Sequence, residues 1–320
     1  MLINATLSFI GSGAMAEAMI KGILGQSLID ASNITASGPR PERAQELRGR
    51  YGIRAITDNR AAARAGKIVV LSVKPQTLPK VMPEICPALD PGDLIISIVA
   101  GTPISVMRRD LGIETIVRAM PNTPGQIGHG MTVWTATEAV NETMRRQSQA
   151  ILGALGRELF VVDEGYLDMA TALSGTGPAY VFLFMEALID AGVHLGFSRR
   201  VAQELVYQTI DGAVAMARET GLHPTELRNR VTSPGGTSAE ALYQLEKGSL
   251  RTVISKAIWA AYQKSKALGE LAVAAPPGAV SGRSAVGPSS REGAESSHPE
   301  KSPAPPADDG EVRFAGEEVK

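Results

Sequence analysis

Several features that mark particular protein classes are missing from the 320-residue sequence. A single cysteine, Cys86, excludes an intrachain disulfide framework, and four scattered histidines give no zinc-type spacing. The chain has 32 Lys and Arg residues against 33 Asp and Glu, and a net charge of -1 creates no overall field that would attract nucleic acid or an anionic membrane. The sequence therefore predicts no metal site and no nucleic-acid or membrane partner.

Targeting and membrane-spanning segments are also missing from the sequence. Met1 to Thr6 leads directly into a strand-like run, without the basic and apolar regions of a secretory leader. No apolar run approaches the roughly 20 residues that span a bilayer. With 44% hydrophobic residues, the chain is long enough for two domains with cores of their own. We therefore expect a cytoplasmic protein with two folded domains.

The N-terminal part predicts a dinucleotide-binding fold. Thr6–Ile10 is a short β-rich run, and a pattern with helical spacing follows the glycine turn next to it. The turn consists of Gly11, Ser12, Gly13, Ala14, Met15 and Ala16. Strand, turn and helix in this order are the context of the G-x-G-x-x-A fingerprint, in which Gly11 permits the tight turn, Gly13 lets the backbone approach a pyrophosphate, and Ala16 lets the helix lie close on the sheet. The alternative is a tight turn with no ligand.

The end of the second predicted strand, Ile34–Ser37, indicates which dinucleotide is bound. A NAD-selective site usually carries Asp or Glu here for the ribose 2′-hydroxyl, whereas this chain offers Ser37, Arg40 and Arg43. Hydroxyl and guanidinium groups suit a 2′-phosphate, since each charge-assisted hydrogen bond contributes about 1.5–3 kcal/mol. We predict NADPH as the cofactor, with NADH as a weaker alternative. Both arginines could instead solvate the start of the next helix, and this is favoured for Arg43.

Strands and helices continue to alternate along this part of the chain. Lys67–Val73 and Leu94–Val99 are near-continuous apolar runs, as in parallel strands that are covered on both faces. The remaining predicted elements are strands at Thr115–Arg118, Met131–Thr135 and Glu158–Val162 and a helix at about Asn141–Leu155. One doubly wound α/β domain of the Rossmann type, over residues 1–162, accounts for this order.

Loops at the carboxyl ends of these strands are further candidates for cofactor contact, because open parallel sheets bind ligands there. Lys74 suits contact with ribose or phosphate, or is an exposed loop lysine. Asn122 lies in a stiff loop between two prolines, and its amide suits the nicotinamide or the loop itself. The candidates in these loops are Val73, Lys74, Pro75, Ala100, Gly101 and Asn122.

After Asp163 the strand signals stop, and we predict an all-helical domain over residues 163–272. Its expected helices are Ala179–Leu195, Arg199–Thr220, Pro224–Arg230, Ser238–Lys247 and Ser249–Leu271. The first two have apolar faces too long for a small domain to bury alone, which predicts packing against a second subunit. These faces comprise Val181, Leu183, Phe184, Leu188, Leu205, Val206, Ile210 and Val214. Residues 273–320 lack apolar periodicity and are predicted to be disordered.

The stretch Val231–Leu245 (VTSPGGTSAEALYQL) predicts a seat for a small anion. Pro234 disfavours helix before it, and the two glycines that follow permit a bend with positive φ. Thr237 and Glu240 match the capping box that opens a helix. Free N–H groups and the dipole at such an N-terminus suit a carboxylate, which gains about 0.3–1 kcal/mol there and up to about 2 if partly buried. The alternative is a capped turn between two helices.

With these motifs in this order, the chain resembles the pyrroline-5-carboxylate reductases over about residues 7–270. The segment VTSPGGTSAEALYQLE is similar to the family signature, and FIGSGAMA, SVKPQ, MPNTP and ALSGTGPAY are similar to its other motifs. The resemblance implies reduction of 1-pyrroline-5-carboxylate to L-proline, the last step of proline biosynthesis. It also implies an interwoven helical dimer, in some members a ring of dimers, with the active site at the dimer interface. The chain departs from the family in Ser238, where threonine is common, and in its long C-terminal tail.

The reaction suits the residues at the anion seat. Reducing a cyclic imine needs a hydride donor, a seat for the carboxylate and a proton for the ring nitrogen. An iminium is already electrophilic, so positioning should supply much of the catalysis. We expect Ser238 and Thr237 to act in catalysis, with Ser238 hydrogen-bonded to the substrate. Substrate-binding candidates are Gly235 and Gly236, whose N–H groups together with that of Thr237 would hold the carboxylate, and, more weakly, Ser233 and Ser174, the last of which also suits a helix-entry turn.

Three rival functions fit the sequence less well. β-Hydroxyacid dehydrogenases carry a lysine shortly after a glycine-containing turn, whereas no lysine or histidine follows Gly175-Thr176-Gly177 here. A deazaflavin-dependent reductase shares the first domain but does not need an anion seat in the second. A scaffold protein that senses NADP does not explain a hydroxyl-lined anion site.

Overall fold

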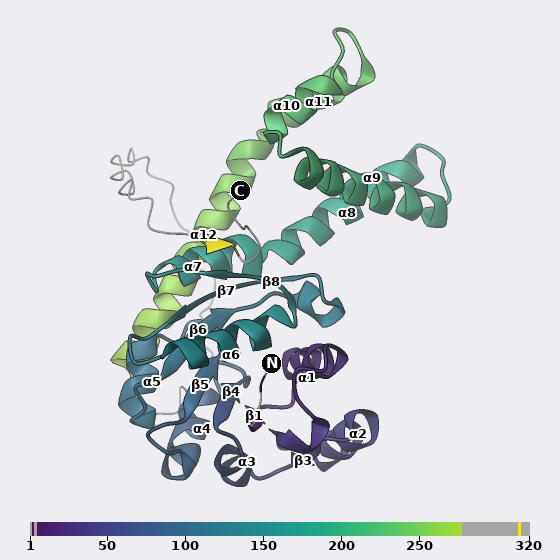
Figure 1. Cartoon of the computed structure of the whole chain (residues 1–320). Coiled ribbons are helices and arrows are strands. Elements are labelled where there is room, and N and C mark those ends of the chain that lie inside the picture. Colours follow the sequence, from purple (N-terminus) through teal and green to yellow (C-terminus); the bar gives the residue numbers. More distant parts are fainter. Residues whose placement is uncertain (1, 3–4, 277–312, 315–320) are drawn as a thin grey trace, which may run out of the picture. The chain divides into compact units, whose positions relative to one another are not determined.

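The computed structural model describes residues 2, 5–276 and 313–314 of the chain, and its elements are labelled in Figure 1. The chain divides into two compact units, the first formed by Met1–Asp168 and Lys266–Lys320 and the second by Met169–Ser265. The second unit is therefore shorter at both ends than the helical domain predicted over residues 163–272. The chain thus returns to the first unit in the middle of its last long helix.

A twisted sheet with strand order β3-β2-β1-β4-β5-β6-β7-β8-β9 organises the first unit. The strands β1 to β6 are mutually parallel, β7 runs antiparallel to β6, and β8 runs parallel to β7. The strands are β1 Leu7–Ile10, β2 Ile34–Ser37, β3 Arg54–Ile56, β4 Ile68–Leu71, β5 Leu94–Ser97, β6 Ile116–Met120, β7 Gly130–Ala136, β8 Gly156–Phe160 and β9 Arg313–Phe314. The predicted doubly wound fold is confirmed, and β3 is the one of its strands before residue 162 that the sequence did not predict.

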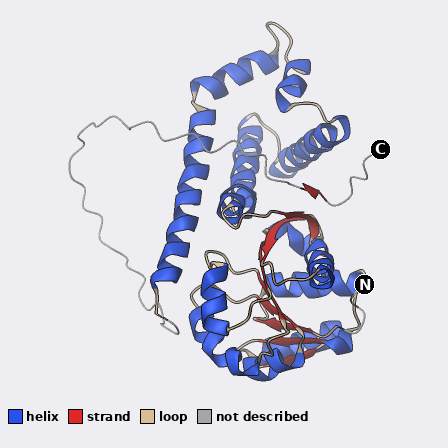
Figure 2. Cartoon of the chain, turned by 60° about the vertical axis from the view of Figure 1, so that its left-hand side comes forward, coloured by secondary structure: helices blue, strands red, loops and turns tan. Residues whose placement is uncertain are grey.

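Helices cover both faces of this sheet, as Figure 2 shows with strands in red and helices in blue. Neighbouring residues of the inner strands point to opposite faces, so Phe9 belongs to one hydrophobic core and Ile10 to the other. Val70 and Val69 on β4 divide in the same way. The helices of this unit are α1 Ala14–Gly25, α2 Pro41–Tyr51, α3 Asn59–Ala65, α4 Leu78–Ile85, α5 Ile104–Leu111 and α6 Glu142–Gly153, and α7 Tyr166–Ala170 follows at the boundary.

The second unit is helical. Its helices are α8 Gly177–His194, α9 Arg199–Thr220, α10 Pro224–Arg230, α11 Thr237–Lys247 and the first part of α12 Leu250–Ala274. The bounds of α9 and α10 agree with the sequence prediction at both ends. Helices α8 and α9 pack closely, because a Cβ atom on Gly192 would lie 3.0 Å from the Cβ of Ala202. Each of these two helices has one buried residue, Ile189 and Ala202.

Large apolar side chains lie exposed along α8 and α9. Leu183 is 66% exposed and Leu205 is 50% exposed. The segment Tyr166–His194 is long and apolar enough to cross a membrane by length and composition alone. The sequence prediction that no run approaches such a length is wrong on this measure, because α7 continues into α8 through a π-helical turn at Thr171–Gly175. One such helix is weak evidence for a membrane span, and an apolar face of this kind is equally what self-association covers.

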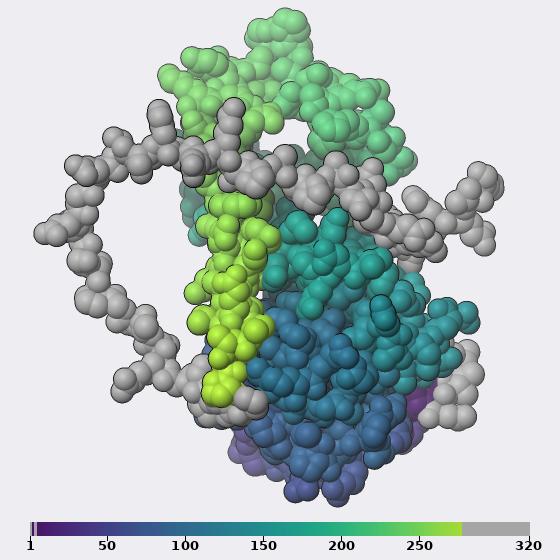
Figure 3. Space-filling view, turned by 90° about the vertical axis from the view of Figure 1, so that its left-hand side faces the viewer, coloured from purple at the N-terminus to yellow at the C-terminus, as the bar shows by residue number. Residues whose placement is uncertain are grey.

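The end of α12 departs from the predicted boundary of the tail. The helix continues to Ala274, so the first two residues of the segment predicted to be disordered are helical. Arg109 of α5 donates to the carbonyl of Val273, and Ala272 packs on the core of the first unit, which holds this end in place. Figure 3 shows this end of the helix, in yellow-green, against the blue part of the same unit. Arg313–Phe314 pairs with β8 as β9, and residues 277–312 and 315–320 of the predicted tail lie outside the described residues.

Candidate functional site

The glycine turn after β1 has the geometry that a dinucleotide requires. Gly11 has a φ of 107°, and a Cβ atom there would lie 2.7 Å from the backbone of Ser72, so only glycine fits. A Cβ atom on Gly13 would meet nothing within 4 Å, which leaves open space at the N-terminus of α1. Ala16 is fully buried where α1 lies on the sheet. The turn therefore offers backbone N–H groups and the positive end of a helix dipole to a ligand.

A cavity of about 370 Å³ opens beside this turn. It brings together the predicted residues Ser12, Gly13, Ala14 and Arg40. The other residues that line it are Glu17, Glu42, Arg43 and Glu46. Met15, also predicted here, instead packs partly against the core. The residues of the turn and the cavity fit the pyrophosphate and the adenosine end of a dinucleotide.

Ser37 does not line this cavity, and its contact with the cofactor stays a prediction. Its side chain is fully buried in β2, between β1 and β3. Its hydroxyl donates to the side-chain oxygen of Asn59 at 2.8 Å. The strand thus directs this hydroxyl into the protein, and of Ser37 and Arg40 only Arg40 lines the cavity.

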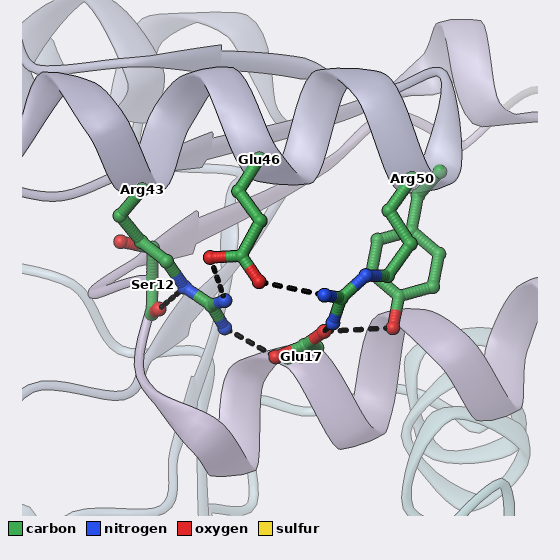
Figure 4. A network of polar contacts seen from close by, with 6 residues as sticks. Ser12, Glu17, Arg43, Glu46 and Arg50 are labelled. Atoms are coloured by element: carbon green, nitrogen blue, oxygen red, sulfur yellow. Dashed lines mark hydrogen bonds and ion pairs between the residues drawn. The ribbon is translucent and has the colours of Figure 1, made fainter.

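Arg43 is an integral part of the site, so the prediction that it only solvates the start of α2 is wrong. Its Nε donates to the carbonyl of Ser12 at 3.1 Å, and its Nη1 donates to Glu46 at 2.7 Å. Its Nη2 pairs with Glu17 of α1, and Figure 4 shows how these groups converge between the two helices. Arg43, which lies one turn into α2, thus reaches over the glycine turn. The sequence signal for Glu17, an acidic residue in the first turn of α1, went unused.

Electrostatics keep the Glu17 carboxylate ionised. Burial raises its pKa, but hydrogen bonds from Arg43, Tyr51 and Arg50 outweigh burial, so that the pKa lies below the ordinary value of 4.5. The pKa of Arg43 is raised, chiefly because its guanidinium donates a hydrogen bond to Glu17. The two side chains therefore form a fixed ion pair at neutral pH.

The residues predicted to contact the cofactor in the loops after β4 and β5 have different surroundings. Lys74 is exposed, whereas Val73 packs partly against the core. Pro75, Ala100 and Gly101 line a second cavity of about 220 Å³, closed by α4, α5 and the end of α12. Gly101 has a φ of 68°, and a Cβ atom there would lie 2.9 Å from the Cβ of Leu268. Close packing of α12 is therefore one reason for this glycine, and the predicted cofactor contacts of these loops stay predictions.

Asn122 holds its own loop, one of the two roles that the sequence left open. Its side-chain oxygen accepts a hydrogen bond from the N–H of Met131 at 2.9 Å. The residue also stands at the N-terminus of the 3-10 segment Thr123–Ile127. That oxygen is thus already engaged, and contact of Asn122 with nicotinamide stays a prediction.

Arg118 and Glu164 form an anchor that the sequence analysis missed. Arg118 on β6 is 5% exposed and donates to Glu164 at 2.7 Å. The same carboxylate oxygen accepts the N–H of Ile104 at 2.8 Å, so it caps α5 from a distant part of the chain. Asp168 lies 3.7 Å from the guanidinium. An arginine inside the apolar run of β6 was the signal that could have revealed this anchor.

The bend that the sequence predicts as an anion seat lies in the second unit, and the structure corrects its geometry in two respects. Gly235 has the predicted positive φ, at 70°. Helix α11 begins at Thr237 with Gly236 as its N-cap and no side-chain cap, so the predicted capping box of Thr237 and Glu240 does not form. The N–H of Gly236 donates to the Ser233 carbonyl at 3.1 Å and is not free for a ligand. Within the described chain, the N–H groups of Gly235, Thr237 and Ser238 have no acceptor.

Ser174 has the helix-entry role that the sequence gave as its alternative. Its hydroxyl donates to the carbonyl of Ala170 at 3.0 Å within the π-helical turn. Ser238, by contrast, is half-buried in the first turn of α11. Among the described residues, no group of three or more His, Cys, Asp or Glu side chains could hold a metal ion.

Comparisons with known proteins cover both units. Residues 164–268 match the family model for pyrroline-5-carboxylate reductase dimerisation, and residues 6–101 match the model for coenzyme F420-dependent NADP oxidoreductases. The pyrroline-5-carboxylate reductase of Pseudomonas aeruginosa is 40% identical over 265 residues, which covers 82% of this chain and 97% of that protein. The enzyme of Synechocystis sp. is 37% identical over 264 residues, covering 82% of this chain and 98% of that protein.

Solved structures of pyrroline carboxylate reductases are similar to this chain over most of its length. The Plasmodium falciparum pyrroline carboxylate reductase, determined with NADP bound, has a TM-score of 0.77 and 37% identity, and the match covers 84% of this chain and 100% of that one. The Coxiella burnetii enzyme has a TM-score of 0.76 and 36% identity, with coverage of 82% and 98%. The similarity thus extends through both units rather than through the dinucleotide fold alone.

Proposed function

The chain belongs to the pyrroline-5-carboxylate reductase family, an oxidoreductase family, and we propose that it reduces 1-pyrroline-5-carboxylate to L-proline with a hydride from NADPH. The observation that carries the proposal is the uncapped N-terminus of α11, where three N–H groups without acceptors in the described chain are available to a carboxylate. The cavity at the glycine turn supports the choice of a dinucleotide as the hydride donor.

The first unit would hold the cofactor by its backbone and by one arginine. The N-terminus of α1, with Ser12 and Gly13, would hold the pyrophosphate, because it carries roughly half a positive charge. Arg40, exposed on the cavity wall, would pair with the 2′-phosphate. When bound, the reduced nicotinamide supplies a hydride to the C=N carbon of the substrate. The structure of the Plasmodium falciparum relative was determined with NADP bound, which supports NADPH over NADH.

The second unit would bind and orient the substrate. The N–H groups of Gly235, Thr237 and Ser238 would donate to the carboxylate, with the dipole of α11 adding to the attraction. The hydroxyl of Ser238 would hydrogen-bond at the ring nitrogen. The iminium form already carries a proton on that nitrogen, so addition of a hydride to the adjacent carbon yields the secondary amine of proline. These residues thus act by positioning rather than as strong acids.

Self-association follows from membership of a family defined by its dimerisation segment. The exposed apolar residues of α8 and α9 support this face as the one that a second subunit covers. Assembly of such dimers into a ring and localisation to the cytoplasm stay predictions.

The proposal is tested by the absorbance of NADPH or NADH in mixtures of purified protein and 1-pyrroline-5-carboxylate. We expect rapid oxidation that depends on the substrate and is faster with NADPH. If protein shown to be folded and self-associated oxidises neither cofactor, the proposal is wrong, although the dinucleotide fold stands.

A further inference from the structure

Carboxylates outnumber guanidinium groups in the cavity beside the glycine turn. Arg40 and Arg43 line it together with Glu17, Glu42 and Glu46, so its wall has a formal charge of -1. A phosphate monoester such as the 2′-phosphate of NADPH carries about -1.5 to -2 at neutral pH. A wall with this charge does not attract such a group by its net field. Selection must therefore depend on which arginine is free to bind the phosphate.

The two arginines differ in the hydrogen bonds and ion pairs that their side chains already make. The guanidinium of Arg43 donates in three directions, to the Ser12 carbonyl, to Glu46 and to Glu17, and its side chain is only 14% exposed. Arg40 is exposed, and its side chain makes no hydrogen bond or ion pair with any other described residue. Arg40 is thus ready to bind an anion, whereas Arg43 must first give up a carboxylate.

Of the two carboxylates that pair with Arg43, Glu17 is the harder to displace. Its side chain is 18% exposed, and its second oxygen accepts hydrogen bonds from Arg50 and from the hydroxyl of Tyr51 at 2.8 Å. Arg50 approaches this carboxylate from the side opposite Arg43, as Figure 4 shows. Glu46 also accepts a hydrogen bond from Arg50, at 2.7 Å, but its side chain is 42% exposed and can turn toward water. A 2′-phosphate that reaches for Arg43 therefore competes mainly with Glu17.

We propose that Glu17 limits the preference of this chain for NADPH over NADH, because its carboxylate competes with the 2′-phosphate for the guanidinium of Arg43. The inference rests on the proposed function, since it takes this cavity as the adenosine end of the cofactor site. In this arrangement Arg40 supplies the phosphate contact, and Arg43 chiefly fixes the glycine turn through the Ser12 carbonyl. Removing the charge of Glu17 makes a second guanidinium available to the phosphate.

The test compares two nucleotides that differ only in the 2′-phosphate, adenosine 2′,5′-bisphosphate and adenosine 5′-monophosphate. Their dissociation constants are measured by calorimetry on the full-length protein and on the variants Glu17→Gln and Glu42→Gln. We expect Glu17→Gln to tighten binding of the bisphosphate about tenfold, equivalent to about 1.4 kcal/mol, and to leave the monophosphate nearly unchanged. Glu42→Gln is the matched control, because the substitution removes the same charge from the same cavity wall. Glu42 itself makes no hydrogen bond or ion pair with Arg43.

Three outcomes in which the substitutions change nucleotide binding would overturn the inference. Weaker bisphosphate binding by Glu17→Gln would mean that Glu17 holds Arg43 in place for the phosphate. An equal gain in Glu42→Gln would mean that the net charge of the wall acts, rather than competition for Arg43. A gain that persists in the double variant Glu17→Gln, Arg43→Met would exclude Arg43 as the group released.

The nucleotides carry no nicotinamide, so the result does not depend on reductase activity. If neither nucleotide binds any form of the protein, the cofactor site itself is wrong and the inference falls with it. If both bind without any dependence on Glu17, the inference alone is wrong. Should Glu17→Gln fail to fold, Glu46→Gln removes the more exposed partner of the same guanidinium and should give a smaller gain in the same direction.

Discussion

Ser238 and its neighbours determine whether the N-terminus of α11 is a substrate site or only a turn. Replacing Ser238 with alanine removes the hydroxyl but keeps the helix, so it should lower kcat about 10- to 100-fold, the equivalent of one hydrogen bond to a charged group. The dissociation constant of NADPH should change little. Steady-state kinetics together with a cofactor titration measure both quantities.

Ser238→Thr is the control, because threonine keeps the hydroxyl that the alanine variant lacks. It should restore turnover. A loss of NADPH affinity in Ser238→Ala as large as the loss of turnover would assign Ser238 a structural role and contradict the proposed contact.

At the scale of single residues, the sequence predicted backbone requirements better than side-chain directions. The positive φ values of Gly11 and Gly235 follow from motifs that only glycine can satisfy. The direction of the Ser37 hydroxyl was not predictable, because both faces of an inner strand are buried and composition does not reveal which way a side chain points. Arg43 was misjudged and Glu17 was missed, because their pairing depends on how α1 and α2 lie together, which no local pattern encodes.

The anchor of Arg118 and Glu164 joins three elements of the first unit, β6, α5 and the segment before α7. Glu164→Gln weakens the pairing of a buried guanidinium and the cap on Ile104. We expect the free energy of unfolding to fall by about 1–3 kcal/mol, below the cost of a fully uncompensated buried charge because Asp168 remains nearby. Urea unfolding measures this difference.

Glu142→Gln is the matched control for that variant, since Glu142 pairs with Arg146 while both side chains stay largely exposed. Exposed pairs on a helix contribute about 0.3–0.5 kcal/mol, so this change should be small. Equal effects of the two substitutions would show that the anchor does not stabilise the fold.

The elements themselves were largely predictable, because most have long periodic patterns with clear ends. Helix α9 ends where Gly221 takes a φ of 62°, and α10 begins with Pro224 in its first turn. Strand β3 was missed because it has three residues, of which Arg54 is exposed. The capping box at Thr237 failed because the bend at Gly235 lets the helix begin one residue earlier than expected.

At the scale of the whole molecule, the exposed apolar residues of α8 and α9 predict a stable dimer. Leu183→Glu places a charge on that face and should shift the protein toward monomer at micromolar concentration, as measured by sedimentation velocity. Ile127→Glu is the control, because Ile127 is 73% exposed but belongs to the first unit. A wild-type protein that sediments as a monomer, or a Leu183 variant that associates like wild type, would contradict this assignment.

The sequence indicated this face from the apolar residues along two predicted helices, but it did not reveal how the chain is shared between the units. The end of α12 packs with the first unit through contacts such as Leu268 beside Gly101, more than 160 residues apart in the chain. Contacts at such separation leave no periodic signal, so a domain boundary at residue 272 was the natural expectation.

Formation of L-proline from 1-pyrroline-5-carboxylate, measured against NADPH consumed, tests the central claim most directly. We predict one L-proline for each NADPH oxidised, with no consumption of NADPH when the imine is left out. NADPH consumption without proline, or neither with folded and associated protein, would contradict the assignment of this reaction to the chain.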